Sequence, residues 1–132
     1  MLRITRSLLE TCLAAAKSAY PNEFIGLLEG ERQKSPDGKS FSLTLKRLIV
    51  PPGISVSPSF SYYSEWLLPV MPDVWGSFHS HPGTKNNRPS RADLHAFSNE
   101  GGVHLIAAEP FGPENIAAYG HEGKKLEFEI VD

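Results

Sequence analysis

The chain has little of what would place it in several common protein classes. Only one of its 132 residues, Cys12, is a cysteine, so no disulfide can form within it and nothing indicates an oxidising compartment. Its 13 basic and 15 acidic residues nearly cancel, at a formal net charge of -2. This balance gives no electrostatic case for nucleic acid or an anionic membrane as a partner. We therefore expect a cytoplasmic protein.

Long hydrophobic runs are also missing. The longest apolar stretches, such as residues 12–16, are far shorter than the roughly 20 residues of a membrane-spanning helix, and no signal-peptide pattern opens the sequence. The hydrophobic fraction of 40% and the charged fraction of 21% suit a soluble globular protein. A chain of this length can bury one core, so we expect a single domain over residues 1–132.

The first half of the chain predicts one helix and a hairpin. Apolar residues recur at helical spacing over residues 7–19, where Ser7 and Glu10 resemble a capping box. The apolar run 24–28 has strand length, residues 31–39 read as a polar turn, and residues 41–50 alternate well enough to pair with the preceding strand.

The second half predicts further strands and a second helix. Residues 51–58 are rich in Pro, Gly and Ser and predict an irregular loop, while residues 90–99 predict a helix closed by two glycines. About six strands with two helices imply a mixed sheet flanked by helices. The strands expected here cover residues 59–68, 73–81, 103–108, 116–119 and 126–131.

Residues 76–93 carry the clearest chemical pattern. His79 and His81 are two apart, and alternate side chains of an extended strand leave on the same face, so both imidazoles can converge on one point. Ser90 and Asp93 follow in a run typical of a helix start, which could return a hydroxyl and a carboxylate to the same locality. Two imidazoles and one carboxylate are a usual catalytic zinc set, because they leave the fourth position to water.

Each part of this pattern has a simpler interpretation. Histidines on strands are more often core or surface residues than ligands, and a serine followed three residues later by an acid is how many helices begin. The two interpretations are compatible, because capping can orient Ser90 while Asp93 turns to the metal.

A zinc hydrolase also needs a base that accepts and returns a proton. Spacing alone cannot choose that base, since most acids are solvated surface residues. Glu23 is favoured because it opens an apolar strand after a helix, where a carboxylate can be partly buried. The other candidates are Glu29, Glu65, Glu100 and Glu109.

Together these segments resemble the JAMM motif of the MPN+ (Mov34/PAD-1) metalloproteases, and most of all their compact archaeal and bacterial single-domain type. The resemblance extends over nearly the whole chain. It implies an α/β fold of three layers, α-β-α, with a mixed sheet flanked by helices, similar to that of the cytidine deaminases. The segments that match are His79-Ser80-His81-Pro82, Ser90-Arg91-Ala92-Asp93 and residues 21–28 around Glu23.

The resemblance implies a role for each matched residue. His79, His81 and Asp93 would bind one Zn²⁺ per chain, with water as the fourth ligand. Glu23 would act as general base, and Ser90 would support the developing oxyanion. The family usually has seven residues between the second histidine and the serine, whereas residues 82–89 number eight here. We expect the loop to bulge without moving either end.

The resemblance also implies a substrate. Family members often cut after the C-terminal Gly-Gly of ubiquitin or a ubiquitin-like modifier, which here suggests a ubiquitin-like or sulfur-carrier protein, cut by a monomer or a homodimer. An extended tail can add to a sheet edge, and we expect its groove between residues 52–66 and 83–88. Ordinary packing is the alternative role for its aromatic residues. The candidate substrate contacts are Phe60, Tyr62, Tyr63, Trp66, Thr84 and Arg88.

Two other functions fit the sequence less well. A non-catalytic scaffold or modifier-binding module of the same family would be expected to lack a ligand, and none is missing. A zinc hydrolase of small amides or nucleobases would need a Pro-Cys-x-x-Cys pair, which a chain with one cysteine cannot supply. Cys12 is expected to be a small core residue. The remaining histidines, expected to be structural or surface residues, are His95, His104 and His121.

Overall fold

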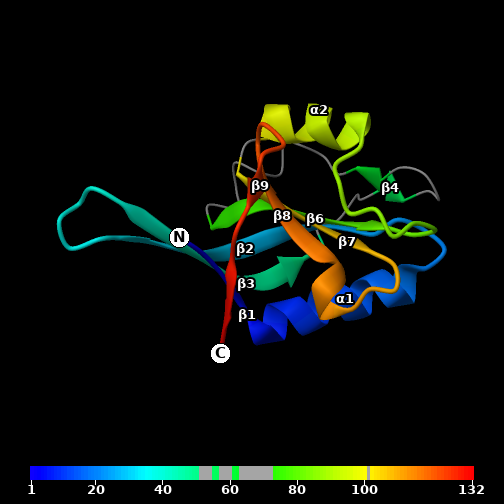
Figure 1. Ribbon diagram of the computed structural model, residues 1–132, viewed down its shortest axis with the longest axis horizontal. Coiled ribbons are helices and arrows are strands. Elements are labelled where there is room, and N and C mark those ends of the chain that lie inside the picture. The colour runs from blue at the N-terminus through cyan, green and yellow to red at the C-terminus, as the bar shows by residue number, and fades with distance from the viewer. Residues whose placement is uncertain (51–54, 57–60, 63–72, 101) are drawn as a thin grey trace.

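The computed structural model describes residues 1–50, 55–56, 61–62, 73–100 and 102–132 (Figure 1). The helices are α1 (Arg6–Ala19), α2 (Arg91–Glu100) and a short 3-10 helix, η2 (Pro113–Asn115). The strands are β1 (Leu2–Thr5), β2 (Ile25–Lys34), β3 (Phe41–Ile49), β4 (Ser55–Val56), β5 (Ser61–Tyr62), β6 (Val74–His81), β7 (Val103–Ala108), β8 (Ile116–Gly120), β9 (Lys125–Leu126) and β10 (Glu129–Val131). None of the described helices is long and apolar enough to cross a membrane.

Eight strands form one mixed sheet in the order β10-β1-β3-β2-β6-β7-β8-β9, and β4 pairs with β5 separately. β1 runs parallel to β10 and β3, β6 runs parallel to β7, and the other pairs are antiparallel. Strands β9 and β10 stand at opposite ends of this order although only two residues separate them in the chain. The sheet must therefore curl until its two ends approach each other.

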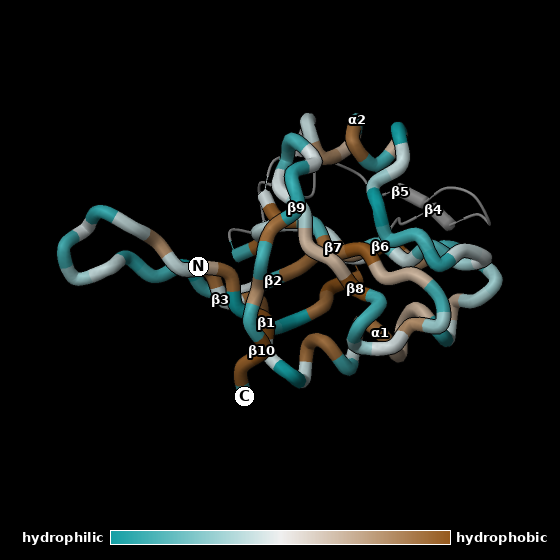
Figure 2. The backbone as a smooth tube through the Cα atoms, viewed as in Figure 1, coloured by the Kyte–Doolittle hydropathy of each residue, from teal (hydrophilic) through white to brown (hydrophobic). Residues whose placement is uncertain are grey.

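The two α-helices lie on opposite faces of the sheet, as Figure 1 shows. On the α1 face, Leu8 and Cys12 of the helix share a buried apolar cluster with Phe78 of β6 and Leu105 of β7. Full burial of each large apolar side chain is worth about 1.5–3 kcal/mol. In Figure 2 the apolar colour follows the central strands, and the tip of the β2–β3 hairpin is hydrophilic.

The α2 face of the sheet is more polar. Because side chains alternate along a strand, Ser77, His79 and His81 point away from Phe78 and toward α2. Phe97 of α2 packs there in a second buried cluster with Ile106, Ala117 and Tyr119. One face of β6 thus serves the core and the other carries polar groups.

The structure confirms the predicted α/β fold and its three layers, together with the β2–β3 hairpin, β6, β7 and the second helix. It corrects the start of the first helix. The cap of α1 is Thr5, whose hydroxyl accepts a hydrogen bond from Leu8 N at 3.2 Å, so the predicted Ser7–Glu10 capping box is wrong. Thr5 also ends β1, a strand too short for its pattern to stand out in the sequence.

Two predicted strands have other bounds. β2 continues to Lys34, into the predicted turn, because its polar end pairs with β3 beyond the body of the sheet. The predicted strand 126–131 is two strands, since the chain leaves β8 after Leu126 and β10 pairs with β1 instead. Within the predicted loop 51–58, residues 55–56 form β4. The predicted strand 59–68 is described only at residues 61–62, and Gly101 lies outside the described residues.

Candidate metal centre

Glu23 reaches the site because the chain before β2 is fastened to β6. Ile25 is paired with His79, and one residue earlier Phe24 N donates to Ser80 Oγ at 2.7 Å while Ser80 N donates to the Phe24 carbonyl at 2.9 Å. These contacts hold the half-buried Glu23 so that its Oε1 lies 3.6 Å from His79 Nδ1. Two residues 56 positions apart (79 minus 23) are thereby brought together.

Asp93 divides its two carboxylate oxygens between the helix start and the site. Oδ2 accepts from Ser90 N at 2.9 Å, and Ser90 Oγ in turn accepts from Asp93 N at 3.1 Å, which makes a reciprocal capping box at the start of α2. The other oxygen, Oδ1, lies 3.7 Å from His79 Nδ1. Capping and a metal role are therefore compatible in this structure.

The Nδ1 atom of His79 gives the strongest indication of a metal site. It is buried and has no hydrogen-bond partner among the described residues. The ligand atoms of Glu23, His79 and Asp93 all lie within 4.8 Å of one another. Zinc bonds to nitrogen and oxygen are about 2.0–2.2 Å long, so two ligands of one ion lie at most about 4 Å apart. The distances from His79 Nδ1 to the two carboxylates satisfy this limit.

His81 stands beside this group with both ring nitrogens facing acceptors. Nδ1 lies 3.0 Å from the Asn86 carbonyl and Nε2 lies 2.9 Å from Asp93 Oδ2, so a protonated ring would donate one hydrogen bond from each nitrogen. Burial opposes that charge, but the bonds to Asp93 and Asn86 and the charges of Asp93 and Glu23 outweigh it and raise the pKa of His81. A metal would have to displace the proton on Nε2.

The pKa of Asp93 is shifted in the opposite direction to that of His81. Its burial favours the neutral acid, but the hydrogen bond from His81, the nearby His79 and the Ser90 N–H together lower the pKa of its carboxyl to about 2. The carboxylate is therefore ionised at neutral pH, the form that a metal ion requires of a ligand.

Thr84 and Arg88, two of the candidate substrate contacts, lie exposed on the loop between His81 and Ser90. That loop is fastened to the segment that follows the neighbouring strand β7, since Gly83 N donates to Glu109 Oε1 at 2.8 Å and Asn87 Nδ2 donates to a carbonyl of η2. Phe60, Tyr63 and Trp66 lie outside the described residues, and of Tyr62 only the place in β5 is described.

The rival bases are engaged elsewhere or lie outside the description. Glu109 accepts the loop bond just described, and Glu29 pairs with Arg47 on the neighbouring strand. Glu65 lies outside the described residues, as does the side chain of Glu100. Among the described candidates, Glu23 alone is in the group of possible ligands.

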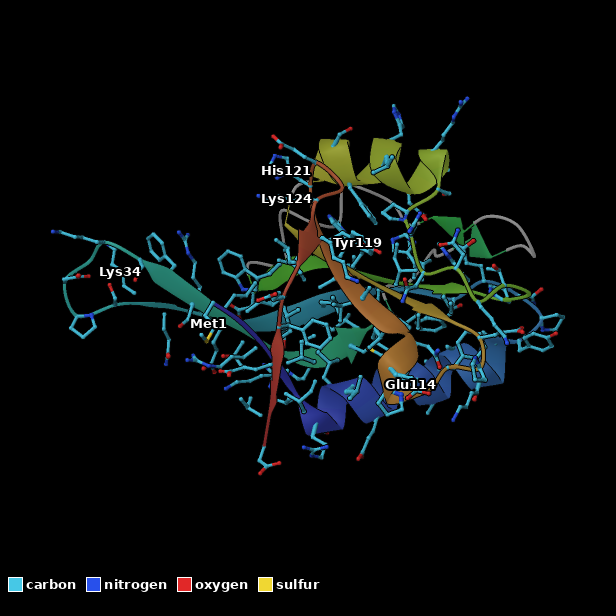
Figure 3. The ribbon with its side chains drawn as sticks, viewed as in Figure 1. Met1, Lys34, Glu114, Tyr119, His121 and Lys124 are labelled. Carbon is cyan, nitrogen blue, oxygen red and sulfur yellow. The ribbon has the colours of Figure 1, made fainter. Side chains whose placement is uncertain are left out.

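Two buried polar residues lie beneath His79, of which reasoning from the sequence missed Ser77 and expected His104 only as a structural or surface residue. Ser77 Oγ lies 2.9 Å from His79 Nε2 and 2.6 Å from His104 Nδ1. Ser77 could have been found, because it is two residues before His79 on the same strand face. No spacing rule reaches His104 on β7. His121, in contrast, is a surface residue as expected, and Figure 3 places it with Lys124 beside α2.

Known proteins resemble the chain over its whole length. Residues 5–120 match the model of a family described as prokaryotic homologs of the JAB domain. A probable metalloprotease of Haloferax volcanii is 31% identical over 129 residues, which cover 98% of this chain and 79% of the relative.

Solved structures agree with this result. A JAB1/MPN domain protein from Archaeoglobus fulgidus is 30% identical, with a TM-score of 0.69, and the alignment covers 100% of this chain and 98% of that one. A JAMM structure described as a metalloprotease-like zinc site in the proteasome and signalosome is 32% identical, with a TM-score of 0.69 and coverage of 100% and 99%. A Desulfitobacterium hafniense protein solved in solution is 25% identical, with a TM-score of 0.71 and coverage of 100% and 94%.

The fold and the group around His79 define a mixed-sheet α/β domain with a candidate metal site formed by the segment before β2, by strand β6 and by the first turn of α2. The chain belongs to the prokaryotic JAB domain family, within the JAMM/MPN proteins.

Proposed function

We propose that this protein is a zinc metallopeptidase whose ligands are His79, His81 and Asp93 and whose general base is Glu23. The observation that carries the proposal is the buried Nδ1 of His79, which lacks a hydrogen-bond partner among the described residues and faces carboxylate oxygens of Glu23 and Asp93. A nitrogen in that setting is suited to a cation. Membership of the family and the metalloprotease named among its relatives support the same reading.

The chain's own residues can carry the proton transfers of peptide hydrolysis. Bound zinc would supply a polarised water with a pKa of about 7 and a Lewis acid for the substrate carbonyl. Glu23 is half-buried beside His79, where its carboxylate can take a proton from the attacking water and return it to the leaving amine. Ser90 accepts from Asp93 N through its oxygen, which leaves its hydroxyl hydrogen available to an oxyanion.

The proposed substrate is a ubiquitin-like or sulfur-carrier protein, cut after its C-terminal Gly-Gly at a linear or an isopeptide bond. Family membership supports this choice, and the chemistry is consistent with it, since a tail without side chains can enter a narrow site in extended form. We propose one zinc per chain.

Metal analysis of the purified protein tests the ligand set. We expect about one zinc per chain, because three protein ligands and a water complete one tetrahedral site. Asp93→Ala and His79→Ala should reduce the bound zinc sharply, whereas Glu29→Gln, a change of an acid outside the site, should not. A wild-type protein that takes up no zinc after reconstitution would rule out the proposal.

Glu23→Gln separates the base from the ligands. We expect this variant to keep its zinc and to lose cleavage by a factor of about 10²–10⁴, the usual contribution of a positioned acid or base. The substrate is a ubiquitin-like protein joined through its Gly-Gly terminus to a reporter, in one version linearly and in another through a lysine. Glu29→Gln is the matched control. Cleavage by Glu23→Gln at the wild-type rate would refute the assignment of the base.

A further inference from the structure

Ser77 and His104 form a short hydrogen-bonded chain beneath His79. Ser77 Oγ lies 2.9 Å from His79 Nε2 and 2.6 Å from His104 Nδ1, and Ser77 and His104 are fully buried. The arrangement follows from the sheet. Ser77 and His79 share one face of β6, and in the parallel β6–β7 register Ser77 stands opposite His104.

The imidazole rings are further held by Phe97 of α2. Its ring stacks on His104, with centroids 3.9 Å apart and an angle of 7° between the planes. It meets the ring of His79 edge-on, at 5.6 Å and 69°. Packing against Phe97 and hydrogen bonds to Ser77 therefore restrict the orientation of both imidazole rings. Neither Phe97 nor Ser77 belongs to the motif that carries the family resemblance.

The serine hydroxyl has one hydrogen, and this fact links the protonation of the two histidines. If His79 carries its proton on Nε2, that N–H donates to Ser77 Oγ, and the hydroxyl of Ser77 donates to His104 Nδ1. His79 Nδ1 is then a bare lone pair facing the carboxylates of Glu23 and Asp93. In the reverse order of donors, Nδ1 of a neutral His79 would carry the proton, and the nitrogen could not bind a cation.

We propose that Ser77 and His104 are positioning residues that hold His79 in the tautomer protonated on Nε2 and so present its Nδ1 to zinc. His81 is oriented differently, through the main-chain carbonyl of Asn86. The inference rests on the proposed zinc site but not on peptide cleavage. In a metal-binding histidine, the hydrogen-bond partner of the ring nitrogen that does not bind the metal typically sets the tautomer and the orientation of the ring.

Zinc affinity measured by competition with a chromophoric chelator is the first test. Ser77→Ala and His104→Leu should each weaken zinc binding about 10- to 100-fold, the usual effect of removing such a partner. His104→Asn places an amide oxygen near the position of Nδ1 and should restore most of the affinity. Ile106→Val, in the same buried cluster beneath Phe97, is the control for packing and should lower stability without weakening zinc.

The second test uses the metal-free protein and does not depend on zinc or on activity. Long-range ¹H–¹⁵N NMR of the histidine side chains should show His79 protonated on Nε2 in the wild type and in His104→Asn. Ser77→Ala should show a mixture of tautomers. The signal of His79 is assigned by its loss in His79→Gln.

The outcomes separate this inference from the proposed function. Protonation of wild-type His79 on Nδ1 would overturn the inference, as would wild-type zinc affinity in both Ser77→Ala and His104→Leu. Failure of the wild type to bind zinc would overturn the proposed function, and the tautomer of the metal-free protein would still decide whether Ser77 and His104 control His79. If His104→Asn and Ile106→Val also bound zinc more weakly than the wild type, the loss of zinc affinity would be explained by altered packing alone. That result would overturn the positioning role.

Discussion

Asp93 shows how one residue serves both the fold and the site. Its Oδ2 accepts hydrogen bonds from Ser90 N and His81 Nε2, and its Oδ1 faces His79 Nδ1. The capping box fixes the carboxylate relative to α2, and Phe97 of α2 packs edge-on against the ring of His79. Replacing Asp93 therefore removes one of the two hydrogen bonds of the capping box, the one that Ser90 N donates to Oδ2, along with the proposed ligand.

Cys12 gives a prediction about alkaline pH. Burial raises the pKa of its thiol to about 12, whereas a cysteine in an unfolded chain ionises near about 8.5. Between these values the unfolded state binds fewer protons than the folded state, so stability falls as pH rises, by up to about 1.4 kcal/mol per pH unit. Denaturant unfolding from pH 8 to 11 should show a smaller loss of stability in Cys12→Ala than in the wild type. An identical loss of stability in the two proteins would contradict the prediction.

At the scale of elements, β6 organises the domain. It lies between β2 and β7 in the sheet, it sends Phe78 into the core beneath α1, and it carries Ser77, His79 and His81 on the opposite face. The parallel pairing with β7 is close at its first residues: a Cβ atom on Gly76 would lie 1.5 Å from the Val103 carbonyl oxygen. The neighbouring atoms belong to the backbone of Val103, which cannot rotate out of the way as a side chain could.

Gly76→Ala should therefore be strongly destabilising. We expect a loss of at least the roughly 1–3 kcal/mol that overpacking usually costs, because β6 and β7 must separate to admit the methyl group. Gly120→Ala on β8 is the matched control, since a Cβ atom there would meet its nearest neighbour at 3.9 Å. Denaturant unfolding of both variants measures the effect, and equal stabilities would contradict the predicted strand contact.

At the scale of the whole molecule, the candidate metal centre joins parts of the chain that are far apart in sequence. Glu23 comes from the segment between α1 and β2, His79 from the middle of β6, and Asp93 from the first turn of α2. A metal ion held by His79, His81 and Asp93, with Glu23 beside it, would bind the folded chain and would have no comparable site in the unfolded one. Metal binding should therefore stabilise the entire domain.

Thermal unfolding with and without zinc tests this linkage. At a free zinc concentration about 100 times the dissociation constant, we expect about 2.7 kcal/mol of added stability. The gain should disappear in Asp93→Ala and with a chelator, and Glu29→Gln should retain it. Equal stabilisation of Asp93→Ala would show that zinc binds elsewhere.

The sequence by itself determined the local parts of the site. The spacing of His79 and His81 placed them on one face of a strand, and Ser90 with Asp93 marked a helix start, because strand alternation and capping are set by neighbours within a few residues. Both elements stand where these patterns predicted them. The His-x-His and Ser-x-x-Asp segments also identified the family that the comparisons show.

Only the tertiary structure decided which distant segments meet. The β2–β6 register places Glu23 beside His79, and the β6–β7 register places His104 beneath Ser77. Likewise, β10 leaves its neighbour in sequence and pairs with β1. Strand partners and registers are selected by which pairing buries the apolar faces of the whole sheet, and no short stretch of sequence contains that information.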